Sequence, residues 1–357
     1  MMNKKIENFF REDINFLNEY KILDSKGMIK LDAMENPFDL GANFKISNLS
    51  SGLVNLNRYP DADSKNLRNQ LQKKYNLNSQ KDVIIGNGSD ELIQLICLAF
   101  LKIENTVLCP SPSFSMYKSI SKVIGLNFEE VPLKEDFSLD INLMLNKIDE
   151  FDPAIIFLAY PNNPTGNLWS KEDIISIIKK SNGVVVIDEA YGDFSGSSFI
   201  ESLNNYENLL IMKTFSKIGL AGIRLGYLFG DKCIIENINK LRLPFNINSL
   251  SQKISELAIE NNQHLEIQIN EICELRDKLL KNMKEINEIR VFESKTNFVL
   301  FKALSGTADD IFKSLLSDKI LIKNMTNAPG LKNCLRVTVG SENENKLFIQ
   351  SLKNAIK

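Results

Sequence analysis

Lys217 stands in a sequence context that can hold a phosphorylated aldehyde. Hydroxyl side chains precede it at Thr214 and Ser216, and Arg224 follows seven residues later. A lysine amine condenses with an aldehyde to form a Schiff base, while hydroxyls and a guanidinium hold a phosphate group. Most lysines are solvated surface charges, so Lys217 is singled out by its neighbours. The pattern predicts covalent chemistry on a phosphate-bearing carbonyl compound.

Four further polar clusters each follow an apolar run that predicts a buried strand. They are Gly86–Glu91, Pro110–Tyr117, Tyr160–Gly166 and Asp188–Tyr191. Because ligands bind outside the carboxyl ends of strands in open parallel sheets, we expect these clusters and Lys217 to converge. Each cluster alone has an ordinary explanation as a turn, a helix cap or a buried aromatic. Their recurrence at successive strand ends favours one shared site.

The clusters offer different kinds of contact. Ser89, a candidate N-cap, opens a helix N-terminus to an anion. Phe114 follows a proline-rich turn and can stack on a planar ring. Asn163 lies in a turn that two prolines fix. Asp188 ends an apolar strand, where a carboxylate needs a positive partner such as a protonated pyridine nitrogen, and Tyr191 can reach a phenolate oxygen on the same ring.

Short β-branched and aliphatic runs alternate with helix-spaced apolar patterns from about residue 80. The runs are Val83–Ile85, Thr106–Cys109, Ala154–Ala159, Val184–Ile187 and Leu209–Met212. Uninterrupted runs of this length fit strands buried on both faces of a parallel sheet. Between them, Glu91–Leu101 and Asp173–Ile178 predict helices. The alternation predicts an α/β fold, with a mostly parallel sheet flanked by helices.

The C-terminal third predicts a smaller α+β domain. Expected helices are Ser251–Met283, Asp309–Leu316 and one from about Glu342, and expected strands are Asn297–Phe301, Ile320–Ile322 and Leu335–Val339. We expect three parts: an N-terminal segment (1–45) that completes the small domain, a large domain (46–245) and the small domain (246–357). The turn at Pro244 is a candidate hinge between the domains.

Composition excludes several classes of function. The net charge of −2 favours neither nucleic acid nor an anionic membrane as a partner. The sequence has no apolar run of the ~18–20 residues that a membrane helix requires and no apolar signal-peptide region. Five scattered cysteines and a single histidine, His264, fit neither a disulfide framework nor a metal site. We therefore expect a soluble, cytoplasmic protein without a metal.

The combined motifs resemble the fold-type I pyridoxal-phosphate aminotransferases, and most closely their histidinol-phosphate aminotransferase branch. The matching strings are Asn57–Asp61, Gly88–Glu91, Asn162–Gly166, Asp188–Tyr191, Thr214–Lys217, Leu220–Tyr227 and Cys334–Gly340. They occur in the family's order over about residues 30 to 340. The joint match is highly specific for the cofactor class and moderately specific for the branch.

The resemblance implies a role for each matching residue. Lys217 would form a Schiff base with pyridoxal 5'-phosphate and then move the proton, with Asp188 on the pyridine nitrogen and Tyr191 on the phenolic oxygen. The further cofactor contacts it implies are Ser89, Asp90, Glu91, Phe114, Asn163, Ala190, Thr214, Ser216 and Arg224, with Tyr59 reaching in from the neighbouring subunit of a homodimer. The substrate contacts it implies are Arg336, Lys323, Tyr117, Asn163 and Tyr59.

The implied reaction is transamination between L-histidinol phosphate and 2-oxoglutarate, in histidine biosynthesis. Three departures bear on the substrate. Lys323 stands where many relatives have arginine, thirteen residues before Arg336, and Met34 stands where asparagine is common. The spacing from Lys217 to Arg224 is seven where many aminotransferases have eight, although the shorter loop occurs in this branch.

Other functions remain open on the same motifs. An aromatic or other amino-acid aminotransferase would share the scaffold, as would a threonine-phosphate decarboxylase. A regulator with an aminotransferase-like sensor would need an added DNA-binding domain, which we do not expect because the motifs start by about residue 32. A catalytically inactive relative would have lost Lys217 or Asp188, and both are present.

Overall fold

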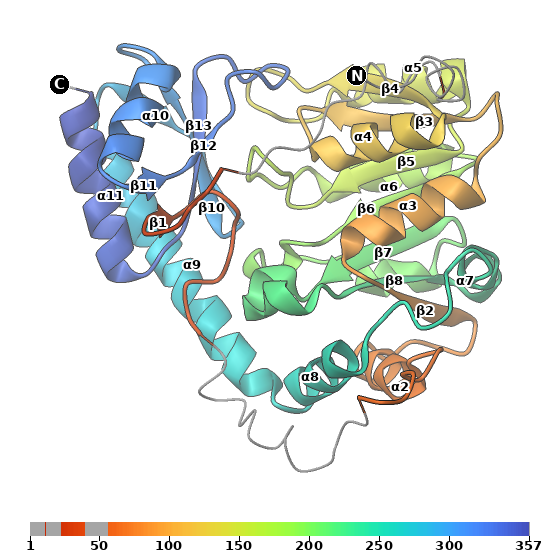
Figure 1. The fold of residues 1–357 in the computed structure, drawn as a ribbon. Helices are drawn as coiled ribbons and strands as arrows, with labels where there is room; N and C mark the ends of the chain where they lie inside the picture. Colours follow the sequence, from red (N-terminus) through yellow and green to blue (C-terminus); the bar gives the residue numbers. More distant parts are fainter. Residues whose placement is uncertain (1–10, 12–22, 40–55, 357) are drawn as a thin grey trace, which may run out of the picture.

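The computed structural model describes residue 11, residues 23–39 and residues 56–356 of the 357-residue chain. Figure 1 shows two bodies side by side: a large one around a long central sheet, and a smaller one that holds the C-terminus. The long helix α9 (Asn262–Lys284) runs from the base of the large body up into the small one.

The central sheet has seven strands in the order β2-β8-β7-β6-β5-β3-β4. Their bounds are β2 (Lys81–Gly86), β3 (Thr106–Ser111), β4 (Asn127–Pro132), β5 (Ile155–Ala159), β6 (Val184–Asp188), β7 (Leu209–Thr214) and β8 (Gly226–Asp231). Neighbouring strands from β4 to β7 are parallel, and β8 runs antiparallel to both β7 and β2. The prediction of a mostly parallel sheet is confirmed. The sequence analysis missed β4 and β8.

Helices cover both faces of this sheet because successive strand residues point to opposite sides. On one face, α3 (Ser89–Ala99), α4 (Ser115–Ile124) and α7 (Lys232–Asn239) pack in one apolar cluster with alternate strand residues such as Val184 and Val186. On the other, α2 (Lys65–Lys74), α5 (Ile141–Phe151) and α6 (Lys171–Lys180) pack with Val185 and Ile187. The α/β fold is therefore confirmed.

The small body is built on an antiparallel sheet in the order β12-β13-β10-β9. The strands are β9 (Ile289–Val291), β10 (Phe298–Ala303), β12 (Lys323–Asn324) and β13 (Cys334–Thr338), and the helices around them are α9, α10 (Ala308–Ser317) and α11 (Glu342–Ala355). A capping box of Ser341 and Glu344 begins α11. This is the smaller α+β domain that the sequence predicts.

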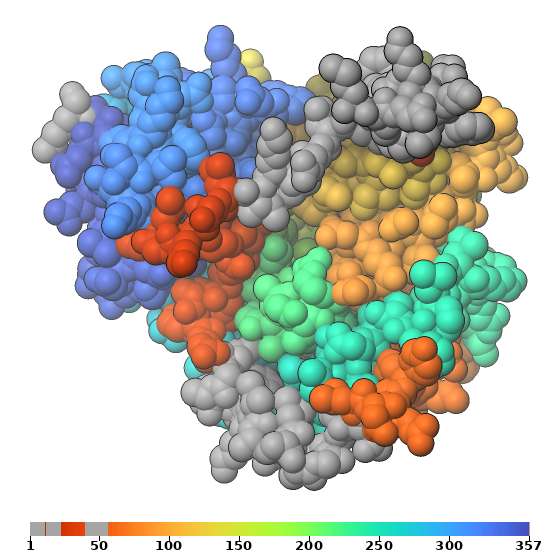
Figure 2. Space-filling model, in the orientation of Figure 1, coloured from red at the N-terminus to blue at the C-terminus, as the bar shows by residue number. Residues whose placement is uncertain are grey.

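The N-terminal segment is part of the small domain where the structure describes it. Strand β1 (Ile29–Lys30) pairs in parallel with β11 (Ile320–Leu321), and Thr338 N donates to Leu31 O. In Figure 2 the red residues of this segment lie against the blue small domain, beside the green part of the large domain. The predicted boundaries at 45 and 245 stay predictions, and the first of them lies outside the described residues.

Helix α8 (Ser249–Glu260) lies beside α2, on the large domain. Gln252 donates to Asp61 O, and Ser251 donates to Ile223 O. Helix α8, which begins just after the predicted boundary at 245, therefore contacts the large domain, and that boundary stays a prediction. No helix among the described residues is both long and apolar enough to span a membrane.

Candidate active site

One cavity brings together most of the residues that the sequence singles out. It lies at the carboxyl ends of β5, β6 and β7 and at the start of α3. Its lining residues are Met34, Ser89, Asp90, Phe114, Ala159, Asn163, Asp188, Ala190, Tyr191, Thr214, Ser216, Lys217 and Arg224. Every predicted cofactor contact except Glu91 and Tyr59 is among them. The convergence expected from the strand ends is therefore present.

The N-terminus of α3 forms one end of the cavity. Gly88, with φ of 82°, is the N-cap residue, and Ser89 is the first residue of the helix, so Ser89 is not the cap that the sequence analysis expected. No side chain caps the helix, which leaves its first N–H groups open to an anion. A Cβ at Gly88 would lie 2.7 Å from Arg224 Nη2. Glycine thus lets the guanidinium approach the helix N-terminus.

Hydroxyl groups line the same end. Thr214 Oγ1 donates to Leu225 O at 3.1 Å and lies 2.9 Å from Ser216 Oγ. Arg224 Nη1 lies 3.5 Å from Ser216 Oγ, and Arg224 Nη2 lies 3.3 Å from Asp90 Oδ2. Two hydroxyls, a guanidinium and a helix N-terminus together have the groups that suit a phosphate.

Lys217 lies just beyond β7, in the kinked segment Ser216–Leu220, where Ile218 and Gly219 have non-helical backbone angles. Its Nζ donates to Ala33 O at 3.3 Å and lies 5.8 Å from the centre of the Tyr191 ring. Burial of the amine, and after it the positive charge of Arg336, lower the pKa of Lys217 to about 8. A solvated lysine titrates near ~10.4, so this amine is far more available as a nucleophile and base near neutral pH.

Asp188 ends β6 and is 4% exposed. Its Oδ2 accepts from the Tyr117 hydroxyl at 2.6 Å, and its Oδ1 accepts from Ala190 N at 3.0 Å. Burial raises the pKa of Asp188 to about 6, against the lowering effect of these two hydrogen bonds. Within the described part of the chain no ion pair joins this carboxylate. The cavity therefore presents a buried acid that a cationic ring nitrogen would stabilise.

Two predicted contacts have different places in the structure. Tyr117, predicted to bind substrate, is fully buried, stacks on Phe157 at 4.6 Å and holds Asp188 from behind. Glu91, predicted to bind the cofactor, turns away from the cavity and accepts from Asn87 N and Asn246 Nδ2. Both corrections have one cause: neighbours in a motif point in different directions once the chain forms a helix.

The small domain supplies the opposite wall. Arg336 Nη1 donates to Asn163 Oδ1 at 2.5 Å, and Nη2 donates to Asp32 O at 3.1 Å. Asn163 Nδ2 in turn lies 3.4 Å from the Tyr191 hydroxyl. Arg336 thus connects the small domain to the residues around Lys217.

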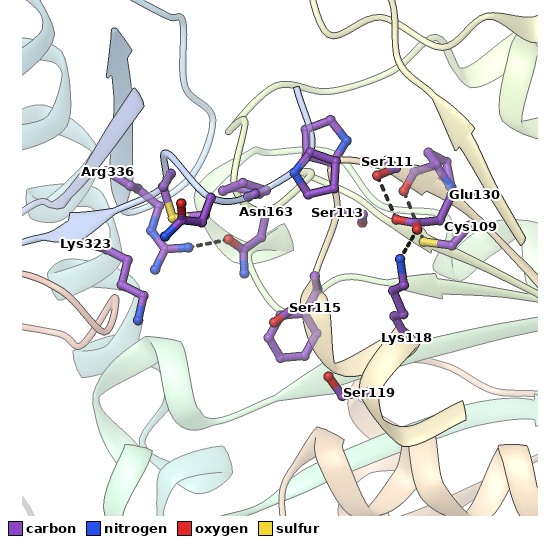
Figure 3. Close-up of a pocket in the computed structure, with 18 of the residues that line it drawn as sticks. Cys109, Ser111, Ser113, Ser115, Lys118, Ser119, Glu130, Asn163, Lys323 and Arg336 are labelled. Atoms are coloured by element: carbon purple, nitrogen blue, oxygen red, sulfur yellow. Dashed lines mark hydrogen bonds and ion pairs between the residues drawn. The ribbon is translucent and has the colours of Figure 1, made fainter. Parts of the chain in front are cut away.

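A second pocket, of about 420 Å³, opens from this wall. Figure 3 shows Lys323 and Arg336 on one side and Ser113, Ser115 and Lys118 on the other. Lys323 and Arg336 are directly opposite residues of antiparallel β12 and β13. Two cations on adjacent strands repel each other and make a favourable place for an anion.

Met34, one of the departures found in the sequence, lines both pockets. Its backbone adopts φ of 55°, its N–H donates to Thr338 Oγ1 and its carbonyl accepts from Asn297 Nδ2. The left-handed region favours asparagine over methionine. The departure noted at this position therefore lies where substrate would pass to Lys217.

Tyr59 lies outside the cavity of its own chain. It is 81% exposed and stacks on Phe245 at 4.5 Å. Its predicted contact with a neighbouring subunit is untested by a single chain and stays a prediction.

The cavity fits a phosphorylated pyridine aldehyde. Lys217 supplies an enclosed amine of lowered pKa, and Asp188 supplies a buried carboxylate that forms no ion pair with a described residue. The start of α3 with Arg224 supplies a cradle that a Cβ at Gly88 would fill. Each observation corresponds to one functional group of pyridoxal phosphate: the aldehyde, the ring nitrogen and the phosphate.

Fold and site together define a pyridoxal-phosphate-dependent aminotransferase. The model of the aminotransferase class I and II family matches residues 26–352, and the chain belongs to that family. Among curated relatives, histidinol-phosphate aminotransferase 2 of Nitrosococcus oceani is 42% identical over 355 residues, which cover 99% of each chain.

Solved structures agree with this assignment. The histidinol-phosphate aminotransferase of Clostridium acetobutylicum superposes with a TM-score of 0.85 at 28% identity, over 92% of this chain and 98% of the other. The fold also matches the Sinorhizobium meliloti histidinol-phosphate aminotransferase in complex with pyridoxal-5'-phosphate, with a TM-score of 0.86 at 21% identity, over 98% and 97% of the two chains.

Proposed function

We propose that this enzyme transfers the amino group of L-histidinol phosphate to 2-oxoglutarate, giving imidazole acetol phosphate and L-glutamate, a step of histidine biosynthesis. The observation that carries the proposal is the pair of opposed cations, Lys323 and Arg336, in the pocket beside Lys217. A phosphate-bearing substrate and a dicarboxylate both need a cationic partner in the pocket beside the amine. The names of full-length relatives support the same choice.

Lys217 has two tasks in this reaction. Its amine would hold the aldehyde of the cofactor, and the free amine would take a proton from the substrate Cα and return it. The lowered pKa of Lys217 suits the second task, because only the neutral amine accepts a proton. When bound, pyridoxal phosphate supplies an electron sink for the charge that develops at Cα.

Asp188 keeps a proton on the ring nitrogen, and Tyr117 keeps the Asp188 carboxylate oriented. Asn163 and Tyr191 would donate to the phenolic oxygen, and Phe114 and Ala190, which line the same cavity, would enclose the ring. The phosphate is held by Ser89, the backbone of Asp90, Thr214, Ser216 and Arg224. These roles follow from the family resemblance and from the groups that line the cavity.

Arg336 binds the substrate's anionic group, the α-carboxylate of glutamate in one half-reaction and the phosphate of histidinol phosphate in the other. Its planar guanidinium suits both anions in a bidentate manner. Lys323, facing it across β12 and β13, adds a point charge for the substrate phosphate. The active form that we propose is a cytoplasmic homodimer in which Tyr59 of each subunit reaches the site of the other.

The test is a pair of half-reactions followed by the absorbance of the bound cofactor. L-Histidinol phosphate and L-glutamate should each convert the pyridoxal form to the pyridoxamine form, with L-phenylalanine as a competing donor. Arg336→Ala should slow both donors, and Lys323→Met should lower kcat/KM for histidinol phosphate about tenfold more than for glutamate. Faster conversion by phenylalanine would move the function to aromatic transamination and leave the cofactor assignment in place.

A further inference from the structure

A buried ion pair lies on the face of the sheet opposite the cofactor cavity. Lys213 Nζ is 3.2 Å from Glu189 Oε2, and the two residues are 4% and 0% exposed. Lys213 precedes Thr214, and Glu189 follows Asp188. Because strand side chains alternate, Asp188 and Thr214 face the cavity while Glu189 and Lys213 face the other side. Each member of the pair is therefore joined by one peptide unit to a residue of the site.

The same ammonium closes the loop that carries Tyr191. Lys213 Nζ lies 3.6 Å from Asp193 Oδ1 as well as 3.2 Å from Glu189, so it joins the two ends of the segment 189–193. A Cβ at Gly192 would lie 3.0 Å from Glu189 Cβ and 3.3 Å from Lys213 Nζ. These contacts are tighter than ordinary van der Waals distances, so the glycine lets this loop pass close to the pair.

The Glu189 side chain does not line the cavity and makes its contacts on the other face of the sheet. Its carboxylate accepts from Ser198 Oγ at 2.7 Å, from Phe199 N at 2.6 Å and from Lys213. These two hydrogen bonds and the ion pair balance the buried negative charge. On the other side of Lys213 the Tyr75 ring lies 5.9 Å from Nζ, and the Tyr75 and Tyr227 hydroxyls bond each other at 3.0 Å. Burial would lower the pKa of Lys213, but Asp193 and Glu189 outweigh it and raise this pKa, so the lysine stays charged.

Stability alone is a weak reason for such a pair. Burying two charges costs about as much desolvation energy as their attraction returns, and apolar pairs of similar volume often stabilise a protein as well. What a fully hydrogen-bonded ion pair provides is one defined geometry. Here that geometry fixes the end of β6 and the loop after it against the end of β7.

We propose that Lys213 and Glu189 are positioning residues of the aminotransferase reaction, which fix the Tyr191 hydroxyl in the place where it donates to the cofactor. The proposal rests on the role proposed above for Tyr191 and is independent of which substrate the enzyme uses. Neither residue touches cofactor or substrate; both act through the segment 189–193 and through β7.

The test uses the cofactor-loaded enzyme and the pH midpoint at which the absorbance of the bound cofactor changes. A donor to the phenolic oxygen favours its anionic form, so a displaced Tyr191 raises this midpoint. Lys213→Met and Glu189→Gln should both raise the midpoint by about half to one pH unit. If the two charges acted on the cofactor only through long-range electrostatics, the outcome would differ. Loss of the Lys213 cation would then raise the midpoint, whereas loss of the Glu189 anion would lower it. A lowered or unchanged midpoint in Glu189→Gln would overturn the proposal.

A mutant cycle separates positioning from electrostatics. Tyr191→Phe should raise the midpoint by itself, and adding Lys213→Met to it should raise the midpoint no further, because the lost contact is the same one. Lys213→Arg keeps charge and donors and should stay within a few tenths of a unit of the parent. Full additivity of the two substitutions would refute positioning. No shift in Tyr191→Phe itself would refute the role of Tyr191, and this proposal with it, while the substrate assignment would stand.

Two further variants guard against simple destabilisation. Arg68→Met breaks a partly buried ion pair with Asp82, 2.7 Å long, between α2 and β2 on the same domain. It should lower the urea midpoint of unfolding and leave the absorbance midpoint unchanged. If Lys213→Met does not fold, the double variant Glu189→Gln/Lys213→Met removes both charges and leaves none unpaired. It should raise the absorbance midpoint as the single variants do, and an unchanged midpoint would show a structural role only.

Discussion

At the scale of single residues, burial of the Asp188 carboxylate destabilises the cofactor-free protein, and a cationic ring nitrogen of the cofactor would offset that cost. The carboxylate is buried and accepts two hydrogen bonds, from Tyr117 and Ala190, and no cation among the described residues forms an ion pair with it. Lys217 carries the complementary cost, an amine whose charged form is disfavoured. The charged forms of both groups are more stable in water than in this cavity. Both groups suit one ligand that has an aldehyde and a basic ring nitrogen.

The burial of Asp188 should make the free energy of unfolding of the cofactor-free protein depend on pH. The pKa of Asp188 is about 6 when folded and near ~3.9 in an unfolded chain. A raised folded pKa means that the stability it contributes is present below about pH 4 and is lost as pH rises through 6. The loss approaches about 2–3 kcal/mol above pH 7. Asp188→Asn removes this ionisation. In urea unfolding, the free energy of unfolding of the variant should therefore rise relative to that of the parent by the same amount between pH 4 and pH 7.

The cofactor-loaded proteins are the control for this comparison. With a protonated ring nitrogen beside it, the carboxylate is stabilised and asparagine is not. The order of stability at pH 7 should then reverse. Parallel pH dependences of the two cofactor-free proteins would show that Asp188 ionises freely in the folded state.

At the scale of elements, the phosphate cradle depends on how closely α3 approaches β8. A Cβ at Gly226 would lie 2.7 Å from Ser89 N and 2.8 Å from the carbonyl carbon of Gly88. Both contacts are with backbone, so no side-chain rotation relieves them. The tight pairing of Gly86 with Gly226 holds β2 and β8 together at the same point.

Gly226→Ala should therefore push the start of α3 away from Arg224 and Thr214. We expect the dissociation constant of pyridoxal phosphate to rise about tenfold, which corresponds to ~1.4 kcal/mol. Gly222→Ala is the matched control, because a Cβ there meets open space in the turn just before Arg224. Equal affinities of the two variants, by fluorescence titration of the cofactor-free proteins, would contradict the cradle.

The same scale shows what the sequence could predict. Strands buried on both faces, such as β5 and β6, are continuous apolar runs and were found within about two residues of their ends. Strand β4 was missed because it is an edge strand with polar residues such as Glu129 and Glu130, half exposed and without an apolar run. Strand β8 was missed because its glycines indicate a turn when considered without their neighbours.

The candidate site was predictable to the extent that its residues follow strands. Positions directly after β6 and β7 lead into the cavity, and there the motif residues lie together. The role of Tyr117 and the pairing of Lys213 with Glu189 were not predictable, because they depend on the register between strands and on which face each residue takes. The apolar pattern of the sequence predicts the strands, but the register in which neighbouring strands pair is seen only in the packed structure.

At the scale of the whole molecule, the site exists only where separate parts of the chain meet. The large domain supplies Lys217 and Asp188, the small domain supplies Arg336 and Lys323, and the N-terminal segment supplies Met34. Lys295 N donates to Gly166 O at 2.7 Å, which ties the small domain to the turn that carries Asn163. Tyr59, exposed on the large domain, is a predicted contact that this single chain leaves outside the site.

If Tyr59 of each subunit serves the active site of the other, mixed dimers of two inactive variants should regain activity. Lys217→Ala and Tyr59→Ala should each lose most activity as homodimers, since each lacks a contact in both sites. When the two variants are mixed and allowed to exchange subunits, about half of the dimers are mixed, and one of the two sites in each mixed dimer has both residues intact. Activity should therefore recover to about a quarter of the parent value, measured per subunit at saturating cofactor. If Tyr59 served the site of its own chain, every mixed dimer would have one defect in each site, and no activity would return.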